Sequence, residues 1–163
     1  MTTDAEITAD FWKHLRSDRV VLLGLEDSAP TALRPMNALL DGDDDSGPIW
    51  FFSSTDSALV KGLGAQDLAL FAFSSKGHDV FATVHGHLTQ STDRADIDRL
   101  WNRWVAAWYK DGKDDPTLAL LRFDPARAEI WRDGSSLLAS LSVLFGADPQ
   151  ADYKDNVAKV SLT

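Results

Sequence analysis

The chain has 163 residues, of which 44% are hydrophobic and 25% charged, enough for one soluble domain with its own core. Its net charge of −9 disfavours nucleic-acid binding, which requires a basic surface. There are no cysteines, which excludes disulfides and thiolate chemistry, and no apolar run approaches the ~20 residues of a membrane span. The N-terminus has neither a basic region nor a signal-peptide core, so we expect a cytoplasmic protein.

The first elements are predicted to be a helix and three strands. Thr3 and Glu6 form a capping-box pattern, and apolar residues follow at helical spacing, which predicts a helix over residues 4–17. Pro35 marks the second strand as an edge strand or a bulge, because proline cannot donate to a ladder. The three strands are expected at 20–25, 31–40 and 48–53, with a turn at 27–30.

In the second half, residues 79–89 alternate between apolar and polar, so one face of this strand is expected in the core. The period changes over residues 93–108, where tryptophans at helical spacing predict one amphipathic helix. Trp101 and Trp104 are expected to pack in the core, whereas Trp108, at the helix end, could cover a flat ring or a partner subunit. The other predicted elements are a helix at 57–64, strands at 68–73, 118–123, 128–131 and 157–162, and a helical segment at 136–145.

Together these elements predict a mainly β fold with flanking helices. Six to eight short strands are joined mostly by short turns, and no long strand-helix-strand rhythm is present. This pattern favours an antiparallel sheet closed as a barrel, with the helices at its ends. We expect residues 1–163 to form a single domain.

The segment from Ile49 to Lys61 is a candidate ligand site. It reads as a buried strand that ends in hydroxyl residues and restarts as a helix. The hydroxyl residues between Ser54 and Ser57 are typical helix caps. A strand that leads hydroxyls and free N–H groups into a helix start can also hold a phosphate. Both interpretations remain open at this stage.

Other kinds of chemistry have weaker support. His85 and His87 share one face of a predicted strand and could ligate one metal ion, but the sequence places no third ligand, so we predict no metal site. The chain has no Gly-x-Ser-x-Gly nucleophile motif, which disfavours that type of hydrolase. It also lacks the glycine-rich loops of triphosphate-binding and dinucleotide-binding proteins.

A series of short motifs runs through most of the chain. They are Arg34-Pro35-Met36, Ile49 to Ser53, Ser57, Thr83 to Gly86, Leu100-Trp101, Ala107-Trp108-Tyr109 with Asp111-Gly112, Asp115-Pro116, and Ala128 to Trp131. In this order and spacing, the chain resembles the pyridoxamine 5'-phosphate oxidase-like proteins, and most closely their general stress protein branch. The resemblance extends from about residue 11 to residue 162.

The resemblance implies a split β-barrel that forms a homodimer, with FMN, or alternatively FAD, in two clefts at the interface. Arg34 is implied as a phosphate or ring contact and Ser57 as a phosphate ligand. Phe52 and Ser53 would face the isoalloxazine ring, and the Trp-Tyr element, Trp108 and Tyr109, would approach from the other subunit. The full set of implied cofactor contacts is Arg34, Pro35, Met36, Phe52, Ser53, Ser54, Ser57, Leu59 and Trp108. No catalytic residue is implied.

The chain departs from the family pattern at the implied phosphate site. Leu59 stands where the pattern has a lysine, and Ala58 stands where the oxidases often have an arginine. We therefore expect weak FMN binding that a Leu59→Lys substitution would strengthen. The function implied is a flavin-binding, stress-related protein, with low oxidoreductase activity as one option. One alternative is a cofactor-free binding or sensing module. Another is a haem or deazaflavin binder in the same cleft, with His85 and His87 as the residues that point to haem.

Overall fold

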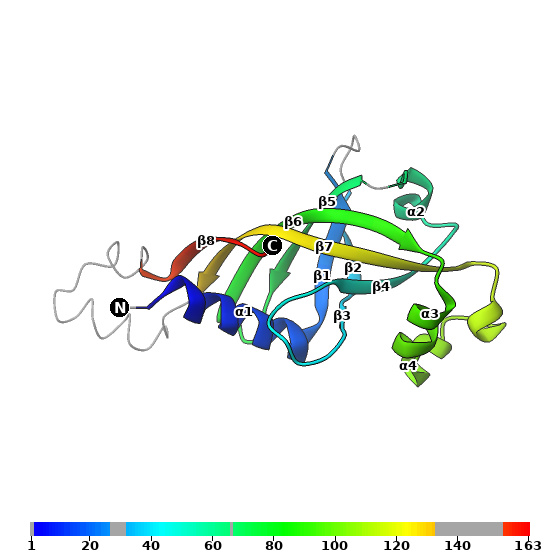
Figure 1. Cartoon of the computed structure of the whole chain (residues 1–163), viewed down its shortest axis with the longest axis horizontal. Coiled ribbons are helices and arrows are strands. Elements are labelled where there is room, and N and C mark those ends of the chain that lie inside the picture. The colour runs from blue at the N-terminus through cyan, green and yellow to red at the C-terminus, as the bar shows by residue number, and fades with distance from the viewer. Residues whose placement is uncertain (1, 27–31, 66, 133–154) are drawn as a thin grey trace.

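The computed structural model describes residues 2–26, 32–65, 67–132 and 155–163. The turn expected at 27–30 and the helical segment expected at 136–145 lie outside these ranges. Within them, eight antiparallel strands form one curled sheet in the order β2-β1-β5-β6-β7-β4-β3, with β8 paired to β7 (Figure 1). This confirms the expected mainly β, antiparallel architecture with flanking helices.

The strands are β1 (Val20–Leu25), β2 (Arg34–Asn37), β3 (Leu39–Leu40), β4 (Ile49–Ser54), β5 (Asp67–Ser74), β6 (Val80–Ser91), β7 (Leu118–Arg132) and β8 (Val157–Ser161). The helices are α1 (Asp4–Asp18), α2 (Ala58–Gly62), α3 (Arg94–Leu100) and α4 (Arg103–Ala106), with a single 3-10 turn, η1 (Gly112–Asp114). None of the described helices combines the length and apolar character needed to cross a membrane.

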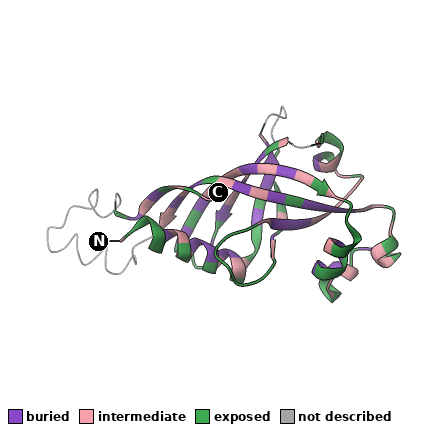
Figure 2. Ribbon diagram, in the orientation of Figure 1, coloured by how far each residue is buried: buried purple, intermediate pink, exposed green. Residues whose placement is uncertain are grey.

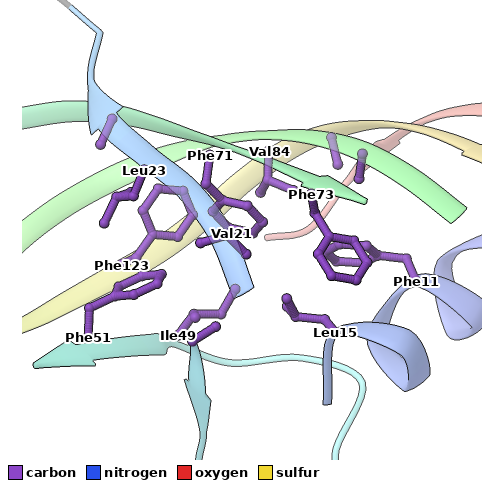
Figure 3. Packing of buried hydrophobic residues seen from close by; sticks show 14 of the residues in the cluster. Phe11, Leu15, Val21, Leu23, Ile49, Phe51, Phe71, Phe73, Val84 and Phe123 are labelled. Carbon is purple, nitrogen blue, oxygen red and sulfur yellow. The ribbon is translucent and has the colours of Figure 1, made fainter. Parts of the chain in front are cut away.

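Helix α1 forms as its sequence predicts and covers the inner face of the sheet. Thr3 and Glu6 make both bonds of the capping box, with the Thr3 N–H donating to Glu6 Oε2 at 2.7 Å. Its buried face includes Phe11, whose ring meets Phe73 of β5 edge-on at 6.1 Å (Figure 3). This packing fixes the helix against one end of the half-barrel.

The core lies inside the curl of the sheet, where buried residues alternate with exposed ones along the strands (Figure 2). The alternation predicted for residues 79–89 is confirmed, because Val84 and its apolar neighbours at every second position face inward. Strand β4 is buried on both faces at its start. Phe51 joins the main core, whereas Trp50 packs in a second cluster with Ile97 and Leu100 of α3.

Two strand predictions need correction. The strand expected at 31–40 is divided, because β2 pairs with β1 whereas β3 pairs with β4. Between them the Ala38 N–H donates to the Arg19 carbonyl at 2.7 Å, which turns the chain from one partner strand to the other. Pro35 does lie in an edge strand, as expected for a residue without an N–H.

The strands expected at 118–123 and 128–131 are one continuous strand, β7. The sequence Asp124-Pro125 looks like a break, but the register with β6 shifts here, opposite Gly86, and the irregularity accommodates the proline. Strand β7 pairs along one side with β6, and along the other with β4 near its start and β8 near its end. Strand β7 therefore connects three other strands of the sheet.

The single helix expected over 93–108 is wrong. Helix α3 ends at Leu100, Trp101 is extended with ψ 133°, and a new helix begins after Asn102. The Asn102 side chain accepts hydrogen bonds from the N–H groups of Trp104 at 2.9 Å and Val105 at 3.0 Å. Asparagine is a strong N-cap, and here the cap outweighs the helical spacing of the tryptophans.

Candidate functional site

A groove of about 760 Å³ lies between the β2–β3 edge, the middle of β4 and the segment that carries α4. Its volume is within the range typical of small-molecule sites. We call it the aromatic groove. It is lined by Arg19, Pro35, Met36, Asn37, Leu39, Phe52, Asn102, Trp104, Val105, Ala107, Trp108 and Tyr109.

The aromatic residues of the groove differ sharply in burial. The lining residues Phe52 and Tyr109 pack together and against Trp101 behind them, with ring centroids 5.9–6.3 Å apart. Trp104 and Trp108 are 71% and 84% exposed, so the expectation that Trp104 packs in the core is wrong. The reason is that α3 ends at Leu100 and a new helix begins after Asn102, so Trp104 does not continue the apolar face of α3. The groove thus has a fixed aromatic wall and two exposed indoles beside it.

Tyr109 belongs to the Trp-Tyr element that the resemblance brings near the flavin, but it was not among the residues predicted as cofactor contacts. Its hydroxyl donates to the backbone carbonyl of Ser53 at 2.5 Å, and only 8% of the residue is exposed. Burial raises the pKa of Tyr109 to about 12, and the negative charge of Asp115 adds to the effect. The available signal was its position beside Trp108 in the Trp-Tyr motif.

The hydroxyl residues after β4 form a compact turn. Ser57 caps α2 and accepts a hydrogen bond from the Val60 N–H at 3.2 Å. The hydroxyls of Ser53 and Ser57 lie 3.2 Å apart, so they share a hydrogen bond. The capping interpretation of this junction is therefore confirmed, and both hydroxyls remain close enough to serve one ligand.

Leu59 does not occupy the position that the sequence analysis gave it. Its side chain is 6% exposed and belongs to the main core, so it does not face a phosphate. The reason is the phase of α2, which directs Leu59 toward the sheet and leaves Ala58 and Lys61 exposed. Only the backbone of Leu59 remains a proposed contact.

The other predicted contacts divide into two groups. Pro35, Met36 and Phe52 line the aromatic groove, although they come from two separate segments of the chain. Trp108 lines the groove of its own chain, whereas the resemblance implies a contact from the other subunit. Ser53 is tied to the groove through Tyr109. Arg34, Ser54 and Ser57 are not among the lining residues; Arg34 precedes Pro35 on β2 and is exposed. Arg19, which no motif indicated, supplies a cation instead.

The histidines lie elsewhere. Neither His85 nor His87 lines the aromatic groove, which removes the support that they gave to haem in this cleft. His85 Nδ1 is 3.4 Å from Glu26 Oε1, without hydrogen-bond geometry. In the described part of the chain, no three metal-binding side chains are grouped around a common point.

The chain matches one protein family along most of its length. The model of the pyridoxamine 5'-phosphate oxidase like family matches residues 6–150, which is most of the sequence. The chain belongs to the pyridoxamine 5'-phosphate oxidase-like family. This confirms the resemblance drawn from the motifs. No protein with a curated description matches the chain.

Solved structures of general stress proteins resemble the chain in sequence and fold. A general stress family protein from Xanthomonas campestris pv. campestris is 53% identical, with a TM-score of 0.76 over 83% of this chain and 93% of that one. The general stress FMN/FAD binding protein from Xanthomonas citri is also 53% identical, with a TM-score of 0.75 over 81% and 92%. General stress protein 26 from Jannaschia sp. CCS1 is 31% identical, with a TM-score of 0.75 over 98% and 99%. The split-barrel fold is thereby confirmed.

Proposed function

We propose that this protein is a single-domain flavin-binding protein that holds FMN, or alternatively FAD, in the aromatic groove. The observation that carries the proposal is the convergence of Pro35, Met36 and Phe52, from two separate segments of the chain, on one groove. The family motifs imply flavin contacts at these same positions. The Xanthomonas citri protein, described as FMN/FAD binding, supports the same conclusion.

The residues of the groove fit the two parts of FMN unequally. A flat isoalloxazine ring suits the apolar and aromatic walls, which include Met36, Phe52 and Trp108. For the phosphate, the chain offers the hydroxyls of Ser53 and Ser57 near the groove, the guanidinium of Arg19 in its lining, and the exposed guanidinium of Arg34 outside it. Ala58 and Leu59 add no cation there. We therefore expect FMN to bind weakly, mainly through its ring.

A bound flavin would supply hydride and electron transfer, which no side chain of this protein can perform alone. The residues of the groove would orient the ring and keep water from one face. Tyr109 stays protonated at neutral pH, since its pKa is raised to about 12, so it acts as a hydrogen-bond donor. Any oxidoreductase activity would follow from flavin binding, and we assign no catalytic residue.

We also propose that the protein works as a homodimer. The outer face of the sheet is not covered by α1 and carries Val20, Leu22, Leu68 and Phe81, each 40–54% exposed. These four residues share one face, because Leu22 pairs with Ala72, which pairs in turn with Thr83. An apolar surface spread over three adjacent strands is typical of an interface, and a second copy would cover it.

The decisive experiment is an absorbance scan and calorimetric titration of the purified protein with FMN and FAD. We expect partial yellow colour on purification and saturable binding of FMN. If neither flavin binds, the proposal is wrong. The second candidate, a split-barrel binding module without a resident cofactor, would then be preferred, as the missing cations at Ala58 and Leu59 already suggest.

A further inference from the structure

We propose that Tyr109 is a positioning residue through which the protein distinguishes phosphorylated from unphosphorylated flavin. The inference rests on the proposed flavin binding and extends it to one atom, the phenolic oxygen. Tyr109 is the one described residue that both lines the aromatic groove and is hydrogen-bonded by its side chain to the Ser53–Ser57 turn. It therefore joins the ring side of the site to the phosphate side.

The first step is that Tyr109 is itself held in place. Its ring packs against Phe52 at 6.3 Å and Trp101 at 5.9 Å, and its hydroxyl donates to the Ser53 carbonyl at 2.5 Å. The residue is buried, so the ring and the hydroxyl are both fixed by protein contacts. A side chain locked in this way can hold its neighbour to a definite position.

The second step concerns the turn that Tyr109 holds. Ser53 carries the accepting carbonyl, and its own hydroxyl lies 3.2 Å from the hydroxyl of Ser57. A second tie comes from the Thr55 N–H, which donates to the Thr117 carbonyl at 2.9 Å. Thr117 is fixed in turn by Asp115, whose Oδ1 accepts from its N–H at 2.9 Å and its hydroxyl at 2.7 Å. The segment 109–117 thus holds the hydroxyl turn at two points.

The consequence is selective. Removing the Tyr109 hydroxyl leaves the ring contacts with Phe52 and Trp101, so the aromatic wall stays in place. It removes the hydrogen bond to the Ser53 carbonyl and leaves Ser53 held by its pairing with Ala119 of β7, so the alignment of the Ser53 and Ser57 hydroxyls is less tightly fixed. Only a ligand with a phosphate depends on that alignment. Tyr109→Phe should therefore weaken FMN binding more than riboflavin binding.

The experiment is a titration of the full chain, wild type and Tyr109→Phe, with FMN and with riboflavin. We expect the Kd for FMN to rise about fivefold in the variant, and that for riboflavin to change less than about twofold. The ratio of the two constants is the informative readout, because a general loss of stability would move both together. Equal changes in both constants, or no change in either, would overturn the inference.

Two further variants sharpen the result. Asp10→Asn weakens the ion pair with Arg132 at 2.9 Å, at the far end of the molecule from α4 (Figure 1), and should leave the FMN-to-riboflavin ratio unchanged. Ser57→Ala removes the hydroxyl that Tyr109 positions, so Tyr109→Phe should add less than its single effect in the double variant. Full additivity would contradict the inference. If wild type binds neither flavin, the proposed function fails and this inference with it.

Discussion

Trp108 and Tyr109 are adjacent in sequence, yet they are among the most and the least exposed aromatic residues of the site, at 84% and 8%. The chain leaves α4 just before them, so one side chain points outward while the other turns back toward β4. The residue types alone do not show which of the two side chains is buried. Their contrasting environments give them different expected roles, in ligand contact for Trp108 and in support of the site for Tyr109.

Trp108→Ala should weaken flavin binding and leave folding almost unchanged. Loss of one aromatic contact predicts a rise of about three- to tenfold in Kd. Because Trp108 is so exposed, the free energy of unfolding should change by less than about 0.5 kcal/mol. Calorimetric titration and urea unfolding measure the two quantities. Trp101→Ala is the matched control and should lower stability more, since Trp101 packs on Phe52 and Tyr109.

Tyr109 should make the protein sensitive to alkali. Its folded pKa of about 12 exceeds the ordinary value of 10.0, so its contribution to stability is complete below pH 10. That contribution is lost as the pH rises through 10 toward 12, and it amounts to about 2–3 kcal/mol. Urea unfolding from pH 8 to 12 should show a shallower decline for Tyr109→Phe than for wild type. Parallel declines would contradict the assignment.

Ala58 and Leu59 provide a matched pair for the phosphate site. Ala58 is exposed beside Ser57, so Ala58→Lys should lower the Kd for FMN by about three- to tenfold and leave riboflavin unaffected. Leu59→Lys would instead place an ammonium group in the core and destabilise the fold by about 2–4 kcal/mol. Titration and thermal unfolding of both variants test this. A stable Leu59→Lys protein with tighter FMN binding would restore the original sequence-based expectation.

At the scale of elements, β7 decides how the sheet closes. It carries three neighbouring strands, and it can do so because its register shift with β6 lets the strand continue past Pro125. Gly86 lies opposite this shift. A side chain there would collide with the Asp124 carbonyl and approach the Phe123 ring to 2.9 Å.

Gly86→Ala should therefore destabilise the protein by about 2–3 kcal/mol, since the new methyl group meets backbone that cannot move aside cheaply. Gly62→Ala, in α2, is the control. Its added methyl would find only Leu25 at 3.4 Å, so stability should stay the same or rise by up to about 1 kcal/mol. Thermal unfolding of the two variants compares them directly. If the two variants were equally stable, the β7 backbone at Asp124 would move aside more easily than its contact with Gly86 indicates.

At the scale of the whole molecule, one face of the sheet is covered by a helix and the other is exposed. The inner face packs on α1 and holds the core, whereas the outer face presents Leu22 and Phe81 to solvent in the single chain. The proposed dimer resolves this asymmetry.

Leu22→Glu should convert the dimer into a monomer, because two carboxylates would be buried without partners in the interface. Ala9→Glu adds the same charge to the exposed side of α1 and should leave the dimer intact. Light scattering at micromolar concentration reports the mass of each variant. A monomeric wild type would contradict the proposed dimer, and a dimeric Leu22→Glu protein would move the interface to another surface.

The sequence by itself determined the features that depend on neighbouring residues. The capping box of α1, the alternation of β6, the cap at Ser57 and the edge position of Pro35 all follow from local hydrogen bonding and side-chain period. The ordered motifs also determined the family. These signals suffice because each depends on a few consecutive residues, whatever the rest of the chain does.

The tertiary structure decided what the local pattern leaves open. Period shows that Trp104 and Leu59 belong to an apolar stripe, but not which element, if any, covers the stripe. The Asn102 cap turned Trp104 outward, and the sheet buried Leu59. The aromatic groove needs residues from β2, β4 and α4, and Tyr109 reaches Ser53 across 56 positions of sequence. Contacts over such separations form only when the sheet curls, so no local pattern can specify them.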